Sequence, residues 1–177
     1  QSQRLSLYSD YAEQLFRESK AYKCFCSNER LETLRKEQIS KGEMPRYDGR
    51  CRSLSAAEMK AMESSGLQPV IRFHVGRGLI LFDDLIHGKM NFDSAGIGDF
   101  IIIRSDGMAA YNFACIVDDH LMDITHVIRG EDHLSNTPRQ ILIYQALGWQ
   151  PPSFAHHPLI LGTDRSPLSK RHGATAV

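Results

Sequence analysis

The chain has 177 residues, of which 42% are hydrophobic and 24% are charged, and its formal net charge is zero. This composition is typical of a folded protein of one domain, or of one and a half small ones, and argues against intrinsic disorder. A net charge of zero excludes a global basic field for nucleic acid, so any contact with RNA requires a local patch. The sequence has no apolar run near the roughly 20 residues of a membrane helix, so we expect no membrane partner.

Three helices are predicted in the first 66 residues. Apolar residues recur at helical spacing over residues 2–19, which indicates a helix with one buried face. Ser27 is a candidate N-cap for a second helix, which ends at Gly42. Ser55 and Glu58 have the spacing of a capping box, which predicts the start of a third helix.

Short apolar runs in the middle of the chain predict strands. The predicted strands cover residues 70–75, 79–82, a short edge strand near 88–92, 100–103 and 110–117. The last of these would return from a turn at 104–107 and would hold Cys115 as an inert thiol in a buried strand. Residues 20 to about 105 are therefore predicted to form an α+β insertion module. For the adjacent residues Asp118, Asp119 and His120 we expect a helix-capping or structural role.

The last third of the chain has the pattern of an α/β unit. A strand is predicted at 124–129, a turn at 130–133, a helix that begins near Thr137 with Pro138 in its first turn, and a second strand at 157–161. A strand–helix–strand unit of this length implies a right-handed parallel crossover. Ligands bind beyond the carboxyl ends of such strands, at Arg129–Asp132 and Gly162–Lys170.

The spacing of three cysteines is of a metal-ligand type. Cys24 and Cys26 are one residue apart, and Cys51 follows beyond the predicted second helix. A structural zinc site needs four ligands, and Tyr47 is a candidate fourth, with Ser53 a poorer one. The alternative is that these cysteines are small buried thiols. Either reading suits a reducing compartment.

Several segments resemble glutamyl-tRNA synthetases, which are class I aminoacyl-tRNA ligases. The resemblance spans essentially the whole chain in family order, so it is more specific than any one motif. It is carried chiefly by Val-Ile-Arg-Gly-Glu-Asp-His-Leu-Ser-Asn-Thr-Pro-Arg-Gln at 127–140, Tyr-Gln-Ala-Leu-Gly-Trp at 144–149, Leu-Ser-Lys-Arg-His-Gly at 168–173, and shorter matches at 1–4, 46–51 and 104–107.

The resemblance implies an α/β fold: the second half of a Rossmann-type parallel core, preceded by a connective insertion that binds the tRNA acceptor end. Residues 1–19 would end the first half of the core, 20–105 would form the insertion, and 106–177 would form the second half. The chain would then be an internal, inactive piece of a catalytic region. The rest of that core, with its HIGH-type motif, and the anticodon-binding part would lie outside it.

The reaction implied is activation of glutamate by ATP and Mg²⁺ to glutamyl-adenylate, followed by transfer to the 3′ end of tRNA-Glu. Lys170 resembles the lysine of the family's KMSKS-type loop, and Ser169 and Arg171 would assist it at the phosphates. The usual first lysine of that loop is replaced by Pro167. Taken alone, Lys170 and Arg171 would be a solvated basic pair.

The family's substrate positions fall on further residues of the chain. The resemblance implies that Arg129 and a buried Tyr111 stand at the family's glutamate-binding positions. An Arg fork suits a carboxylate, and a buried Tyr hydroxyl can fix its orientation. Asp132, Leu159 and Ile160 match the ATP pocket, together with Lys170. Without the family, Arg129 would be a structural ion-pair partner of Glu131 or Asp132.

The resemblance also bears on the metal and on location. The family's zinc pattern has Cys-x-Cys and a later Cys-x-His, whose last position falls on Ser53, whereas one relative uses Tyr-x3-Cys, which Tyr47 and Cys51 match. Structural zinc therefore stays open. The expected partners are tRNA-Glu, glutamate and ATP. The expected state is a monomer in the bacterial cytoplasm or an organellar matrix.

Two other functions are compatible with the sequence. One is a paralogue similar to glutamyl-Q tRNA-Asp synthetase, which modifies an anticodon base with glutamate and ends its last loop differently. The other is a non-catalytic RNA-binding module made of the insertion and half of the core. The Lys-Arg-His-Gly segment at 170–173 favours the ligase over the paralogue, and the zero net charge argues against autonomous RNA binding.

Overall fold

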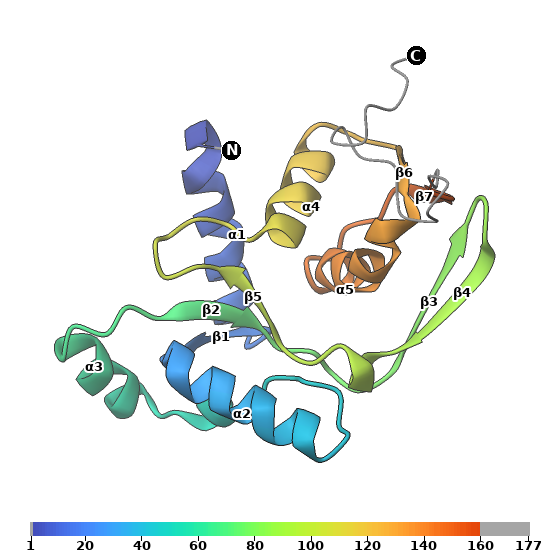
Figure 1. The fold of residues 1–177 in the computed structure, drawn as a ribbon. Coiled ribbons are helices and arrows are strands. Elements are labelled where there is room, and N and C mark those ends of the chain that lie inside the picture. The colour runs from blue at the N-terminus through green and yellow to red at the C-terminus, as the bar shows by residue number, and fades with distance from the viewer. Residues whose placement is uncertain (1, 160–177) are drawn as a thin grey trace, which may run out of the picture.

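The computed structural model describes residues 2–159, which form two β-sheets with helices packed around them (Figure 1). The helices are α1 (Leu5–Arg17), α2 (Asn28–Ser40), α3 (Ala56–Ser64), α4 (Tyr111–Leu121) and α5 (Thr137–Ala146), with short 3-10 helices η1 (Ser2–Arg4), η2 (Arg50–Ser53), η3 (Ser94–Gly96) and η4 (Glu131–Asn136). The strands are β1 (Ala21–Cys24), β2 (Val70–Phe73), β3 (Leu79–Asp84), β4 (Gly88–Asp93), β5 (Phe100–Ile103), β6 (His126–Gly130) and β7 (Ser153–His157).

The first sheet has three antiparallel strands in the order β1-β2-β5. Helices α1 and α4 pack together and against this sheet, and α5 joins them on the same side of the molecule (Figure 1). Tyr8, Leu15, Ile102, Phe113 and Tyr144 are almost fully buried in the shared core. The main apolar core therefore joins the start of the chain to its last third.

The second sheet has the order β4-β3-β7-β6 and combines a hairpin with a parallel pair. β6 and β7 are parallel from His126–Ser153 to Gly130–His157, with α5 between them in the chain. The predicted parallel crossover is therefore confirmed. The β3–β4 hairpin adds to β7 through the Asp84–Phe154 pair, and the amide of Leu85 donates to the Phe154 carbonyl at 2.8 Å.

Because of that pairing, a hairpin from the predicted insertion shares a sheet with the predicted catalytic half. The division of the chain at residues 19 and 105 stays a prediction. Within residues 2–159, β4 and β6 are the two outer strands of this sheet.

The predicted helix boundaries follow their capping chemistry. The hydroxyl of Ser27 accepts from the amide of Arg30 at 3.3 Å and begins α2. Ser55 and Glu58 form the complete capping box of α3. The glycine after α2, Gly42, has φ of +73°, a left-handed conformation that suits the C-terminus of a helix.

The strand predicted at 110–117 is wrong, because these residues belong to α4. Phe113, Ala114, Ile116 and Val117 are its buried residues, and their spacing marks one face of a helix. The β-branched and aromatic side chains suggested a strand, but a helix buries all four against α1 and the first sheet. Cys115 consequently lies half-buried on a helix rather than in a buried strand.

The end of the α/β unit also differs from prediction. β7 ends at His157, where the second strand was predicted to begin. The prediction missed this strand because its buried segment Phe154–His156 contains a histidine, which is not typical of a strand core. The turn predicted at 130–133 is the start of the 3-10 helix η4. Asn136 occupies the N-cap position of α5, and its side-chain amide contacts His133 at 3.2 Å.

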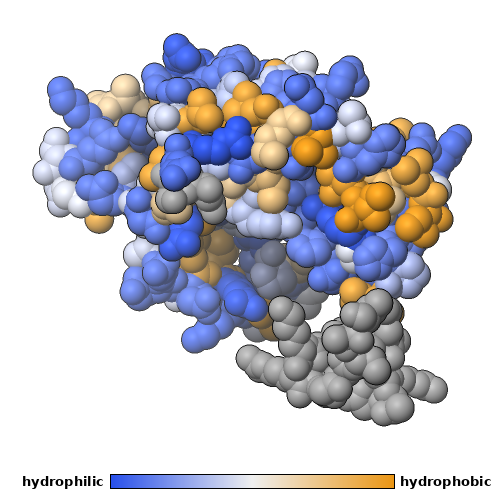
Figure 2. All heavy atoms as spheres, turned by 90° about the horizontal axis from the view of Figure 1, so that it is seen from above, coloured by the Kyte–Doolittle hydropathy of each residue, from blue (hydrophilic) through white to orange (hydrophobic). Residues whose placement is uncertain are grey.

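The hairpin β3–β4 and the turn that joins its strands expose large apolar side chains. Leu79, Leu81, Leu85 and Ile86 are each at least half exposed. Figure 2 shows apolar atoms gathered at the right-hand end of the molecule, where Figure 1 draws this hairpin. Among the described residues, no helix has the length and hydrophobicity to span a membrane.

Candidate active site and metal site

Arg129 lies near the carboxyl end of β6, directly across the parallel pair from His156 of β7. Its guanidinium donates from Nε to Nε2 of His156 at 3.1 Å. Its Nη2 donates to the hydroxyl of Thr137 at 2.7 Å and to the side-chain carbonyl of Gln140 at 2.8 Å. The guanidinium carbon also lies 5.7 Å from the centre of the Phe154 ring. Residues of two strands and of α5 thus fix the position of Arg129.

His156 is fully buried and is bonded on both ring nitrogens. Its Nδ1 lies 2.6 Å from Oδ2 of Asp84, a buried carboxylate at the end of β3. Its Nε2 lies 2.9 Å from the Thr137 hydroxyl, in addition to the contact with Arg129. A polar network of Asp84, His156, Thr137, Gln140 and Arg129 therefore crosses from the hairpin to α5.

Asp84 is held by main-chain donors as well as by His156. Its Oδ1 accepts from the amides of Ile86 and His87, each at 3.0 Å. Burial raises the pKa of Asp84, but the His87 amide, the His156 ring and the other donors outweigh it and lower the pKa to about 2. The carboxylate is therefore ionised at neutral pH.

Tyr111 begins α4 and is 51% exposed, so the expectation that its hydroxyl is buried was wrong. The hydroxyl lies 3.3 Å from Nδ1 of His133 in η4. Partial desolvation raises the pKa of Tyr111, whereas Arg129 acts on it in the opposite direction. The structure thus brings together Tyr111 and Arg129, the two side chains predicted to bind glutamate.

A hollow of about 490 Å³ lies beside Tyr111, with Cys115 and Asp119 of α4 in its lining. Burial raises the pKa of the Cys115 thiol and of the Asp119 carboxyl, and in both cases Arg129 counteracts it. The positive charge of Arg129 therefore reaches this hollow, which has the size of a small-molecule site.

The predicted ATP contacts lie where β6 passes into η4. Asp132 is exposed, and its carboxylate lies 3.7 Å from Nε2 of His133. Leu159 is half-buried, and its amide donates to Glu131 at 3.4 Å. Ile160, Ser169, Lys170 and Arg171 lie outside the described residues, as do Pro167 and the predicted end of the last strand.

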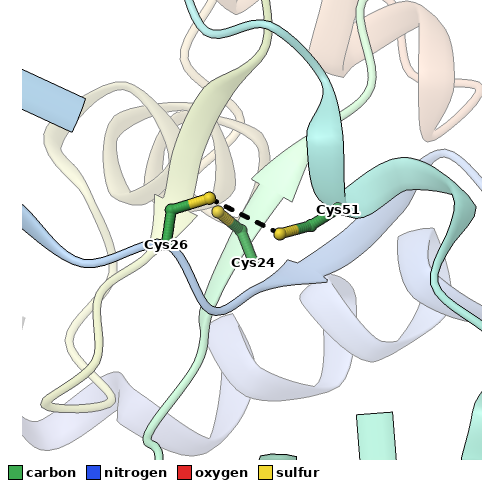
Figure 3. A group of neighbouring side chains, drawn as sticks. All are labelled: Cys24, Cys26 and Cys51. Atoms are coloured by element: carbon green, nitrogen blue, oxygen red, sulfur yellow. Dashed lines mark hydrogen bonds between the residues drawn. The ribbon is translucent and has the colours of Figure 1, made fainter. Parts of the chain in front are cut away.

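The three cysteines predicted as metal ligands come together beside the first sheet. Their sulfur atoms all lie within 4.8 Å of one another, and Figure 3 shows them facing a common point. Sγ of Cys26 is 3.6 Å from Sγ of Cys51, and the Tyr47 hydroxyl is 3.4 Å from Sγ of both Cys24 and Cys26. In a tetrahedral zinc site each sulfur lies ~2.3 Å from the ion, which places the sulfurs about 3.8 Å from one another. The spacing of these residues therefore fits the ion.

The surroundings of the thiol cluster act in opposite directions on Cys24 and Cys26. Nη1 of Arg30 lies 3.4 Å from Sγ of Cys26, and the guanidinium carbon of Arg72 lies 4.1 Å from the centre of the Tyr47 ring. Burial raises the pKa of Cys24, but Tyr47 and Arg72 outweigh it and the pKa is lowered. Burial raises the pKa of Cys26 to about 11. Of these two thiols, Cys24 is thus the closer to the ionised form that a metal ion requires.

The acidic residues at the end of α4 have separate roles. Asp118 accepts from the Tyr8 hydroxyl at 2.8 and 2.9 Å and pairs with Nη1 of Arg4 at 3.1 Å. This contact ties α4 to α1, in agreement with the structural role expected for it.

Sequence reasoning missed Asp84, Thr137, Gln140 and His156. Asp84 and His156 stand near the ends of strand segments that are otherwise largely apolar, and this was the available signal. Burying such side chains in a sheet costs free energy unless they are hydrogen-bonded to a partner.

Comparison with known proteins gives one family over the whole chain. Residues 1–177 match the model of the class I tRNA synthetases (E and Q), catalytic domain. The chain is 58% identical over its full length to a glutamate–tRNA ligase of Heliobacterium modesticaldum and 54% identical to that of Natranaerobius thermophilus. It covers 36% of the length of each of these relatives.

Solved structures agree with the sequence comparison. A glutamate tRNA ligase from Elizabethkingia meningosepticum, crystallised in complex with its amino acid, superposes with a TM-score of 0.86 at 38% identity. The match covers 97% of this chain and 36% of that one.

Proposed function

The chain belongs to the class I tRNA synthetases of the glutamate and glutamine type, and we propose that it is part of the catalytic region of a glutamate–tRNA ligase. The observation that carries the proposal is Arg129, which stands near the carboxyl end of a parallel strand and whose charge acts on Tyr111 and Cys115 in the lining of a hollow of small-molecule size. Such a guanidinium binds a carboxylate, and ligands of α/β sheets bind at this end. The identity of 51–58% to eight glutamate–tRNA ligases supports the same substrate.

In the proposed first step, an oxygen of the glutamate α-carboxylate attacks the α-phosphorus of ATP. A carboxyl–phosphate bond forms and the bond to pyrophosphate breaks, which gives glutamyl-adenylate. Arg129 and Tyr111 hold glutamate, and Asp132 with Leu159 and Ile160 contacts ATP. Mg²⁺ that accompanies ATP would neutralise part of the phosphate charge. Lys170, Ser169 and Arg171 would stabilise the charge that develops on the triphosphate.

In the second step, a hydroxyl of the terminal ribose of the tRNA attacks the activated carbonyl and AMP leaves. Chemistry of this kind depends on positioning and on charge neutralisation more than on acid–base groups. The side chains held by the Asp84–His156 network suit that demand, since their orientation is fixed by hydrogen bonds from two strands and a helix.

A structural zinc is the proposed occupant of the thiol cluster, with Cys24, Cys26, Cys51 and Tyr47 as ligands. Its support is the convergence of the three sulfurs and the phenol hydroxyl on one point. The ion would clamp residues on either side of α2 to β1. Metal analysis of the purified protein tests this, and a content well below one zinc per chain would refute it.

Charging assays test the ligase proposal on a full-length protein that contains this chain. We expect glutamate to be attached to tRNA-Glu in an ATP-dependent reaction, and the Arg129→Ala variant to lose this activity through a raised KM for glutamate. Transfer to tRNA-Asp instead of tRNA-Glu would identify the anticodon-modifying paralogue. Salt-dependent tRNA binding without any charging would identify the non-catalytic module.

A further inference from the structure

The hydrogen-bond partners of Arg129 are all uncharged. They are the imidazole of His156, the hydroxyl of Thr137 and the amide of Gln140. Within residues 2–159, no carboxylate forms an ion pair with Arg129, and the alternative of a structural pair with Glu131 or Asp132 is contradicted. These bonds use three of the five N–H donors of the guanidinium and leave the two on Nη1.

The contacts of His156 define which of its nitrogens carries the proton. Nε–H of Arg129 is an obligatory donor, so Nε2 of His156 must accept and cannot bear a hydrogen. Nδ1 then carries the ring proton and donates it to the Asp84 carboxylate at 2.6 Å. The imidazole is neutral in this arrangement, and it separates the negative charge of Asp84 from the positive charge of Arg129.

The carboxylate that sets this tautomer is itself fixed. Asp84 is 2% exposed, and the amides of Ile86 and His87 hold its Oδ1. Its Oδ2 is therefore directed at the histidine. His156, Thr137 and Gln140 are all at least 98% buried, so water does not compete for these bonds.

We propose that Asp84 and His156 are positioning residues for substrate binding, which fix the guanidinium of Arg129 and keep its charge unpaired for the glutamate carboxylate. The proposal rests on the proposed function, because it takes Arg129 as the glutamate contact. Asp84 acts through His156 and does not touch the substrate.

A consequence is discrimination between charged and neutral side chains. The group that Arg129 binds in this proposal is the side-chain carboxylate of glutamate, because glutamine carries the same α-carboxylate. An unpaired guanidinium among neutral partners gains most from this anionic group, whereas the carboxamide of glutamine leaves the guanidinium without a counter-ion. The network therefore favours glutamate over glutamine. A carboxylate placed among the partners of Arg129 would remove that preference.

The Asp84→Asn variant of the full-length protein tests the tautomer. Its side-chain oxygen can still accept from the Ile86 and His87 amides, but its NH₂ group would face Nδ1 of His156. The ring proton must then move to Nε2, where it opposes the Nε–H of Arg129. We expect the KM for glutamate to rise about 10-fold, the effect of losing one bond to a charged group. We expect kcat and the KM for ATP to stay near the wild-type values.

Asp93→Asn is the matched control. Asp93 ends the other strand of the same hairpin, and its Oδ1 also accepts from a main-chain amide, that of Ala95 at 2.8 Å. This variant should leave all three kinetic constants unchanged. A wild-type KM for glutamate in a normally melting Asp84→Asn protein would overturn the proposal, and so would equal losses in every constant.

Gln140→Glu provides a second test that does not depend on Asp84. It places a carboxylate 2.8 Å from Nη2 of Arg129, where the resulting ion pair supports the fold. We expect a KM for glutamate raised at least 10-fold and a weaker preference for glutamate over glutamine. An unchanged KM and preference would contradict the role of neutral partners. Failure of the wild-type protein to use glutamate at all would instead refute the proposed function.

Discussion

Gly130 lies where β6 ends, and the absence of a side chain there makes room for the carboxylate of Asp132. An added Cβ would stand 2.5 Å from Oδ1 of Asp132 and 3.1 Å from Cδ2 of Leu159. The Asp132 side chain is exposed and can rotate away, so the fold should tolerate the change.

We therefore expect Gly130→Ala to raise the KM for ATP roughly five-fold, by loss of one polar contact of about 1 kcal/mol. The KM for glutamate should stay constant, because Arg129 keeps its partners. Steady-state kinetics with each substrate varied in turn measure both values. A change confined to glutamate would argue against Asp132 as an ATP contact.

Asp84 should make the stability of the chain depend on pH in the acid range. Its folded pKa of about 2 lies below its ordinary value of about 3.9. Its contribution is therefore fully present above pH ~4 and disappears as the pH falls towards 2. Between pH 4 and pH 2 we expect the free energy of unfolding to fall by about 2 kcal/mol more in the wild-type chain than in the Asp84→Asn variant.

Urea midpoints measured from pH 7 to pH 2 give that difference. Asp93→Asn, at an exposed site of the same hairpin, should follow the wild-type curve. Parallel curves for wild type and Asp84→Asn would show that the depressed pKa is not real.

At the scale of single residues, the sequence singled out Arg129 and the three cysteines as candidate ligand contacts, but not the buried side chains that contact Arg129. Arg129 and the three cysteines stand in local patterns that carry their chemistry. Asp84 and His156 are 72 positions apart, and their bond depends on the pairing of β3 with β7. Local periodicity contains no information on that pairing.

Among the elements, those with capping signals or long periodic patterns were predicted well. The helices that begin at Asn28 and Ala56 follow Ser27 and Ser55, as expected. The segment at 110–117 was mistaken because β-branched and aromatic side chains outweighed a helical pattern that continues to Leu121. A window extended past Val117 contains that pattern, so the information was present in the sequence.

The capping box of α3 gives a prediction at this scale. Within Ala56–Ser64 no residue is buried, so the helix has little tertiary packing to replace a lost cap. Ser55→Ala should cost the helix about 1 kcal/mol, which corresponds to roughly five-fold faster amide exchange in α3. Hydrogen–deuterium exchange followed by peptide mass spectrometry measures this.

Ser65→Ala is the control at the other end of α3, where the hydroxyl donates to the Met62 carbonyl at 2.7 Å. The global melting temperature should be unchanged in both variants. A lower melting temperature in Ser55→Ala would mean that α3 contributes to the global fold more than its exposure indicates.

On the scale of the whole molecule, the thiol cluster and the β6–α5–β7 unit stabilise different parts of the chain. Cys24 belongs to β1, Cys26 precedes α2, and Cys51 lies in η2. Within Asn28–Ser40 no residue is buried, so this region is attached by contacts outside the helix, which include the thiol cluster and the ion pair of Arg52 with the buried Asp99.

Removal of the proposed zinc by a chelator should increase amide exchange over residues 26–53 and leave β6, α5 and β7 protected. Exchange mass spectrometry with and without chelator tests this. Cys51→Ala should show the faster exchange without chelator and no further change with it. Equal exchange in the presence and absence of chelator would argue against a metal clamp.

The pairing of β3 with β7 also determines when the second sheet can form during synthesis. The hairpin residues leave the ribosome about 70 residues before β7, so Asp84 is exposed to water without its histidine for several seconds at ~5–20 residues per second. Over that interval Ile80 and Phe82, which share a core cluster with Phe154 in the folded chain, are exposed in a hairpin with no partner strand. A nascent chain stalled before residue 153 should therefore bind chaperones at this hairpin, and release them once β7 has emerged.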